Sequence, residues 1–438
     1  MREHFFDLAD RLTRELHTDE ALLLHLSAER SDFVRFNQGR VRQAGSVEQR
    51  LLSVRLVHER RQAAATIAIA GNGDDLGLAR AMIARLRDAL TQLPEDPWLM
   101  IAESPQATSI ERRGVLAPAE AVVQQVVAAA KGRDLVGLYA AGTNYRGFAN
   151  SFGQRNWHEI DSFNLDWSLH RYTDKAVKAS YAGFDWERAA FEAKLEAATD
   201  ELALLALPPR TIEPGEYRAY LAPRALEDLT GLLCWDAFSA KARATRQSPL
   251  LRMEHGETLA PKVTLIENNR EGVAPCFQDE GFVKPASVTL IADGRLGDAL
   301  VSPRSAKEYG LPTNAANARE SPESLDMAPG TLGLGEVLAA LDTGLYIGNL
   351  WYLNFSDRPA GRITGMTRFA TFRVERGRIV APVNAMRFDD TIYRMLGASL
   401  VDLTRDRELL LDTSTYEERS TASARLPGAL LRALRFTL

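Results

Sequence analysis

The sequence predicts a protein of mixed α and β structure, divided into two domains. Its 438 residues exceed what one hydrophobic core usually fills. Hydrophobic residues make up 45% and charged residues 25% of the chain, as in ordinary globular proteins, which excludes a disordered or collagen-like chain. The hydrophobic pattern also alternates between the period of helices and that of strands.

The first half is expected to open with a helix and to continue with strands. Phe5, Leu8, Leu12 and Leu16 recur at helical spacing, which predicts an amphipathic helix over 1–16. Four strands should follow, at 21–29, 32–37, 49–58 and 61–70, separated by the turn sequences 37–39 and 71–73.

The rest of this half should contain three helices and a β-rich segment. Asp74 or Asp75 can cap a helix that reaches about Leu93, because Asp is a favoured N-cap residue. Further helices are expected near 119–131 and 185–205, with an aromatic, β-rich stretch between them at 135–182.

A Pro-rich segment marks the expected domain boundary. Three prolines and a glycine lie within 206–215, and such a segment can neither continue a helix nor form a central strand. We therefore expect an N-terminal domain at 1–206, a linker at 207–216 and a C-terminal domain at 217–438.

The second half should begin with a strand and a helix and then become β-rich. The strand is expected at 217–221 and the helix from Pro223 to about Ala240. Short strands are predicted at 262–267, 287–292, 345–349 and 368–375.

Composition excludes several classes of function. A formal net charge of -5 argues against direct binding to nucleic acid, which requires clustered positive charge. No apolar run is long enough to cross a membrane, and Asp7, Asp10 and Glu15 interrupt any signal-peptide core. Only two cysteines occur, which fits a reducing compartment, and we expect a cytoplasmic protein.

Histidine and cysteine are too sparsely placed to form a recognisable catalytic centre. None of the seven histidines has a second histidine four residues away, as a helical zinc motif requires. His158 is followed by Glu159 but lies in an alternating segment, so we interpret it as a satisfied or solvent-facing strand residue. Cys234 is expected to be a buried, inert thiol, whereas Cys276 in a loop could be reactive.

An acidic turn, Asp279-Glu280-Gly281, is the remaining candidate from the residues alone. The two carboxylates could bind a cation or a peptide amine. The alternative is a solvated turn in which Gly281 takes a positive φ.

The order of several segments resembles that of the TldD/PmbA family, whose members are described as modulators of DNA gyrase or as peptidases. The matching segments are 31–41, 52–57, 215–225, 279–281, 314–319, 329–330 and 374–383. The resemblance implies an α+β fold, with an N-terminal antiparallel sheet flanked by helices and a β-rich, sandwich- or barrel-like C-terminal domain.

The resemblance also locates a zinc site that this chain should lack. In TldD-type subunits a His-Glu motif and a second histidine lie on the helix that matches 225–236, and a later cysteine completes the site. Here 225–236 contains no histidine and 344–365 contains no cysteine. The chain therefore resembles the PmbA (TldE-like) branch; we expect no metal or cofactor in it and zinc only in a TldD-type partner.

The resemblance implies a non-catalytic subunit that pairs with a TldD-type protease subunit, or with itself, around a chamber for unfolded or short peptides. Asp279, Glu280 and Asn314 are the peptide-binding candidates. The stretch 351–355 would add apolar contacts or form a core strand. Two alternatives remain: a regulatory protein that acts on DNA gyrase, and a hydrolase with an unrecognised nucleophile such as Cys276.

Overall fold

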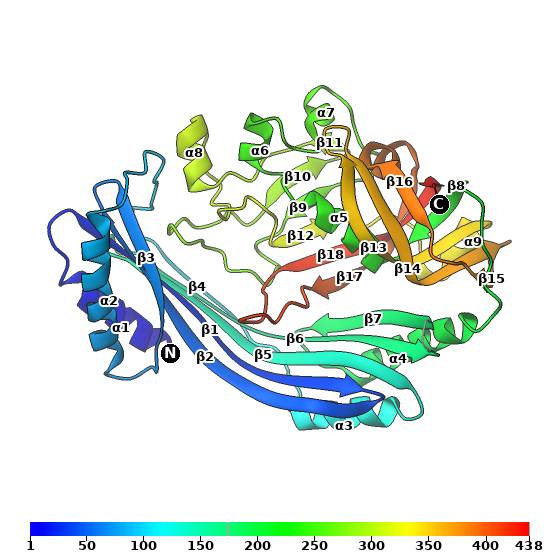
Figure 1. Ribbon diagram of the computed structural model, residues 1–438, viewed down its shortest axis with the longest axis horizontal. Helices are drawn as coiled ribbons and strands as arrows, with labels where there is room; N and C mark the ends of the chain where they lie inside the picture. The colour runs from blue at the N-terminus through cyan, green and yellow to red at the C-terminus, as the bar shows by residue number, and fades with distance from the viewer. Residues whose placement is uncertain (173–174, 438) are drawn as a thin grey trace.

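The computed structural model describes residues 1–172 and 175–437 and contains two β-sheets with helices packed on them (Figure 1). Within these residues the first sheet has seven strands and the second has eleven. This arrangement confirms the expected α+β fold. The two sheets come from opposite sides of the Pro-rich segment, but the exact domain limits stay a prediction.

The first sheet is built from very long, curved strands. Its members are β1 (Glu20–Asn37), β2 (Arg40–His58), β3 (Arg61–Ala68), β4 (Ala107–Arg112), β5 (Asp134–Asn150), β6 (Arg155–Arg171) and β7 (Lys175–Gly183). They lie in the order β3-β2-β1-β5-β6-β4, with β7 also paired to β6. The sheet curves beneath the second sheet, so that residues of both line the space between them (Figure 1).

The strands predicted at 21–29 and 32–37 form one continuous strand, β1. It pairs with β2 along its whole length, from Glu20 opposite His58 to Asn37 opposite Arg40. The intervening turn is as expected, since Gln38 and Gly39 have φ of 53° and 65°. The strand predicted at 49–58 starts earlier than expected, because β2 begins at Arg40. Residues 40–48 are exposed and show no alternation, which hid that part of β2.

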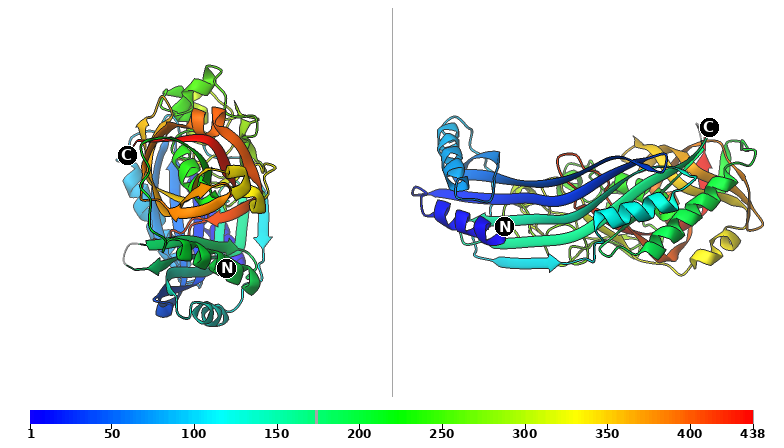
Figure 2. Two further views of the ribbon diagram at one scale, coloured as in Figure 1. Left: turned by 90° about the vertical axis from the view of Figure 1, so that its right-hand side faces the viewer. Right: turned by 90° about the horizontal axis from the view of Figure 1, so that it is seen from below.

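In the described part of the chain four helices accompany this sheet, close to where the periodicity predicts them. They are α1 (Arg2–Thr13), α2 (Asp75–Leu90), α3 (Ala119–Ala129) and α4 (Arg188–Leu204). The first two pack at one end of the sheet and the other two at the opposite end (Figures 1 and 2). Phe5 and Leu8 of α1 are buried, together with Leu24 of β1 and Leu52 of β2.

The second sheet contains a closed ring of strands. The strands are β8 (Gly215–Leu221), β9 (Leu265–Glu267), β10 (Val288–Ala292), β11 (Arg295–Leu296), β12 (Ser324–Met327), β13 (Gly344–Asp357), β14 (Arg362–Glu375), β15 (Arg378–Pro382), β16 (Arg387–Thr391), β17 (Leu400–Leu411) and β18 (Ser423–Phe436). The path β8-β13-β14-β16-β18 returns to its start because β18 also pairs with β8.

Helix α5 (Pro223–Leu233) packs its apolar face against this ring. Leu226, Leu229 and Leu233 are fully buried with residues of β13 and β18. The predicted helix end at about Ala240 was wrong, since α5 ends at Leu233 and Asp236 has a left-handed φ of 70°. The short helices α6 (Ala240–Ala244), α7 (Leu251–Glu254), α8 (Pro303–Tyr309) and α9 (Val337–Leu341) lie outside the ring (Figure 1).

The segment 412–422, here called the β17–β18 loop, joins the two sheets. Arg419 is only 4% exposed and donates hydrogen bonds to the carbonyl oxygens of Gly142 on β5 (3.1 Å) and Ser162 on β6 (2.9 Å). Glu418 forms an ion pair with Arg146 at 3.1 Å. The loop thus fixes the second sheet onto the first. No helix in the described part of the chain is long and apolar enough to cross a membrane.

Candidate functional site

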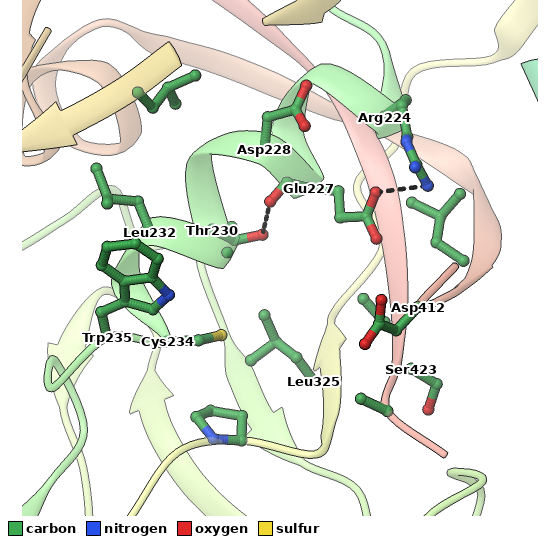
Figure 3. A pocket seen from close by; sticks show the side chains of 16 residues that line it. Arg224, Glu227, Asp228, Thr230, Leu232, Cys234, Trp235, Leu325, Asp412 and Ser423 are labelled. Carbon is green, nitrogen blue, oxygen red and sulfur yellow. Dashed lines mark hydrogen bonds and ion pairs between the residues drawn. The ribbon is translucent and has the colours of Figure 1, made fainter. Parts of the chain in front are cut away.

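A cavity of about 540 Å³ opens beside α5 and is here called the α5 pocket (Figure 3). The helix supplies Arg224, Glu227 and Asp228 to it, and the β17–β18 loop supplies Asp412. The helix can present these charges because its leucines, on the other face, fill the ring. Glu227 and Asp412 point into the same space from two different elements (Figure 3).

The carboxyl groups of α5 are shielded from water and already engaged. Glu227 pairs with Arg224 at 2.9 Å, and Asp228 accepts a hydrogen bond from the backbone N–H of Leu350 at 2.9 Å. Burial raises the pKa of Glu227 to about 7 and that of Asp228 to about 6, although Arg224 acts in the opposite direction on both. Both groups therefore change charge near neutral pH.

The donors in the α5 pocket do not fit a catalytic zinc ion. Such a site uses neutral imidazoles, thiolates or free carboxylates with one open position. Helix α5 has no histidine, its Glu227 is held by Arg224, and burial raises the pKa of the Cys234 thiol to about 12. Across residues 1–172 and 175–437, no three His, Cys, Asp or Glu side chains are grouped to hold a metal.

The predicted acidic turn lines a different cavity, of about 270 Å³, between the two sheets. His25 of β1 and Arg146 of β5 face it from the first sheet, and His25 Nε2 lies 3.7 Å from Asp279 Oδ1. Glu280 accepts a hydrogen bond from Arg55 at 3.0 Å. The structure therefore brings Asp279 together with an imidazole and Glu280 together with a guanidinium, in what we call the turn cavity.

His25 could not be assigned to this site from the sequence. It is separated from the acidic turn by some 250 residues, and only the packing of the second sheet on β1 places them together. Burial lowers the pKa of His25 despite the opposing charge of Asp279, so the imidazole is neutral at pH 7.

Asn314 lies outside both cavities. Its Oδ1 accepts a hydrogen bond from Val301 N–H (2.8 Å), and its Nδ2 donates to Ala299 O (2.7 Å). The amide therefore joins the segment that follows α8 to the segment that precedes it, and the predicted contact of Asn314 with peptide stays a prediction.

The aromatic stretch 351–355 belongs to β13, as a strand was expected there, but two of its residues are not core. Trp351 is 53% and Tyr352 82% exposed, whereas Leu353 lines the α5 pocket. The interpretation of this stretch as a core strand was wrong for the two exposed rings.

The remaining chemical candidates have structural roles. His158 is buried in β6, as the strand interpretation expects, and its Nε2 lies 3.0 Å from Val273 O, whereas its Nδ1 has no hydrogen-bond partner among the described residues. Burial raises the pKa of Cys276, so this thiol is not activated as a nucleophile.

Gly281 has the positive φ that the turn interpretation requires, at 88°, and a Cβ there would lie 2.7 Å from the Phe148 ring. Gly281→Ala should therefore lower the free energy of unfolding by about 1–3 kcal/mol, because both the backbone and the contact become strained. The measurement is urea denaturation. Gly77→Ala in α2 is the control: nothing lies within 4 Å of its Cβ position, so it should be stabilising by up to about 1 kcal/mol. An equal change in the free energy of unfolding in Gly281→Ala and Gly77→Ala would contradict the prediction.

The fold and the α5 pocket define a class of α+β protein with two sheets. In this chain the helix that packs against the closed ring, α5, carries carboxylates and no imidazole. A family model described as the PmbA/TldA metallopeptidase C-terminal domain matches residues 214–437. The chain belongs to the TldD/PmbA family.

Solved structures share the fold over nearly the whole chain. TldE from Thermococcus kodakarensis has a TM-score of 0.79 and 14% identity, with 99% of this chain and 100% of that chain covered. A proposed modulator of a DNA gyrase from Thermotoga maritima has a TM-score of 0.78 and 14% identity, with 100% of each chain covered. A further proposed modulator of DNA gyrase, from Bacteroides thetaiotaomicron, has a TM-score of 0.77 and 16% identity, with 99% of this chain and 98% of that chain covered. A comparison with curated proteins found no match.

Proposed function

We propose that this chain is a non-catalytic, TldE-like subunit of a TldD/PmbA-type metalloprotease complex, in which it forms part of a chamber for unfolded or short peptides. The observation that carries this proposal is the donor set of α5. A metallopeptidase of this family would need zinc ligands on this helix, and here the helix offers a guanidinium and two engaged carboxyl groups.

The proposed subunit works with a partner of the TldD type, which supplies the zinc, and a homodimer is the alternative assembly. Peptide would be held in the cavities between the sheets, where Asp279 and Glu280 can accept hydrogen bonds from a peptide amine. Both cysteines are free thiols, in keeping with a cytoplasmic location.

The proposal predicts that the purified chain alone contains no stoichiometric zinc and cleaves no unfolded peptide. The measurements are elemental analysis and a fluorogenic peptide assay. Activity should arise when a TldD-type chain is added, and mutation of that partner's zinc-binding histidines should abolish it. Zinc at one equivalent per chain together with cleavage by the chain alone would contradict the proposal. Cys276→Ser should not change activity of the complex, which separates this proposal from a thiol hydrolase.

A regulatory action on DNA gyrase is the second candidate, because two proteins of the same fold carry that description. The acidic net charge of -5 favours contact with a protein over contact with DNA. A change in the rate of gyrase supercoiling on addition of the chain would support this candidate.

A further inference from the structure

The α5 pocket adjoins a second cavity, and the two together form a groove with opposite charges at its ends. The second cavity, of about 690 Å³, lies over the start of α6 and is here called the α6 pocket. Cys234, Trp235 and Pro322 line both cavities. Each volume lies within the range of about 300–1,000 Å³ that is typical of ligand sites.

One end of this groove carries an excess of negative charge. Glu227, Asp228 and Asp412 line the α5 pocket, and Arg224 is the single cation that lines it among the described residues. The guanidinium of Arg224 forms ion pairs with Glu227 at 2.9 Å and with Asp166 at 3.9 Å. The side chain of Asp412 accepts a hydrogen bond from Ser414 N–H at 3.0 Å and has no cationic partner among the described residues. A cation entering this end would meet an unneutralised carboxylate.

The other end carries an excess of positive charge. Lys241, Arg319 and Arg358 line the α6 pocket, but only Arg358 has an acidic partner in the part of the chain that the structure describes, namely Asp236 at 2.7 Å. Glu320 also lines this pocket, yet its carboxylate is engaged by backbone N–H and serine hydroxyl donors. Lys241 and Arg319 are therefore available to an anion.

The middle of the groove is apolar and lies close to an open strand edge. Trp235 is 62% exposed, and Pro322 and Leu353 lie nearby in the lining. On one edge β13 pairs with β8 only from Leu345 to Ile347, and the N–H of Leu350 is then bonded to Asp228; beyond Leu350 no described strand covers that edge. An extended chain could add to such an edge through its backbone while its side chains contact the indole.

We propose that this groove binds short peptides by their two charged termini, with the ammonium group at Asp412, beside the Arg224–Glu227 pair, and the carboxylate group at Lys241 and Arg319. The order of charges, the apolar middle and the open β13 edge together match an extended, zwitterionic peptide. The inference rests on the proposed function and goes beyond it, since it adds a second peptide-binding surface, the groove beside α5 and α6, and names the two free ends of a peptide as what this surface recognises.

The test is isothermal titration of the full chain with alanine-rich peptides of four to eight residues, each carrying one phenylalanine. Each peptide is used with free ends, with an acetylated N-terminus and with an amidated C-terminus. Each cap should weaken binding about 10-fold, and this corresponds to the loss of about 1.4 kcal/mol of binding free energy.

Two variants assign the ends of the groove. Asp412→Asn should remove the penalty of acetylation and leave that of amidation, whereas Lys241→Met should do the reverse. Lys131→Met is the control, because Lys131 is exposed and lines neither cavity. Thermal unfolding of each variant confirms that it is folded.

The outcomes separate this inference from the proposed function. Equal affinity for capped and uncapped peptides would overturn the inference and leave the proposed function standing. Preference for free ends that neither variant alters would place the site elsewhere and would also overturn it. Failure of the partner to gain activity would contradict the proposed function, whatever the peptides show.

Discussion

Arg419→Ala is expected to lower the free energy of unfolding by about 3–5 kcal/mol, because it removes one partner from a buried charge cluster. The guanidinium is 4% exposed and lies in the electrostatic reach of Glu29, which is 1% exposed. Its loss takes one buried cation away from Glu29 and removes the hydrogen bonds that the guanidinium donates to the carbonyl oxygens of Gly142 and Ser162. The β17–β18 loop should then detach from the first sheet.

Urea denaturation followed by circular dichroism measures this loss, and limited proteolysis reports the release of 412–422. Arg432→Ala is the matched control, because Arg432 is an exposed arginine on the neighbouring strand β18; it should change stability by less than about 0.5 kcal/mol. A loss below about 1 kcal/mol in Arg419→Ala would show that the buried cluster does not hold the sheets together.

The second large effect is a loss of stability in acid caused by His158. Burial lowers the pKa of this imidazole from 6.5 to about 4, so the folded protein resists its protonation while the unfolded chain accepts the proton. Above pH 6.5 the imidazole of His158 is neutral in the folded and in the unfolded state, so it does not make the free energy of unfolding depend on pH. Between pH 6.5 and 4 the unfolded state is stabilised because it binds the proton. The free energy of unfolding therefore falls as the pH is lowered, by about 3 kcal/mol in total at pH 4.

The measurement is the free energy of unfolding from pH 7.5 to 4 for the wild type and for His158→Gln. The difference between the two isolates His158, because Glu201, Glu227 and Glu267 act in the opposite direction. Burial raises the pKa of each of these carboxyl groups to about 7, so their contribution favours folding as the pH falls. The exposed His255, changed to Gln, should leave the wild-type pH dependence unaltered. A constant difference across the range would contradict the prediction.

The helices of the first half were predictable because each has one apolar face. Phe5 and Leu8 in α1, and Ile83 and Leu86 in α2, are buried where the helical period places them. The first part of β2 was not predictable, because it lies at an uncovered edge with both faces exposed and carries no alternation. The end of α5 was also hidden, because neither Gly nor Pro marks the turn at Asp236.

The candidate sites were predictable only in part. The acidic turn could be recognised from Asp279, Glu280 and Gly281, but its partner His25 comes from a distant strand. The α5 pocket was missed because the search concentrated on histidine and cysteine. Two adjacent carboxylates on an otherwise apolar helix, Glu227 and Asp228, were the available signal. Asp412 could not be added, because only the packing of the β17–β18 loop brings it near α5.

The closed ring of the second sheet has a consequence for the order of folding. Gly215 at the start of β8 pairs with Phe436 at the end of β18, so the ring joins segments separated by nearly the whole second half of the chain. Pairing between such distant segments is slow, because the entropy of closing a long loop is lost before the stabilising contacts form. During synthesis on the ribosome α5 emerges long before β18, and the cover that β18 gives its leucines is missing until the last strand of the ring has been translated. This interval is when the nascent chain is most open to aggregation or to capture by a chaperone.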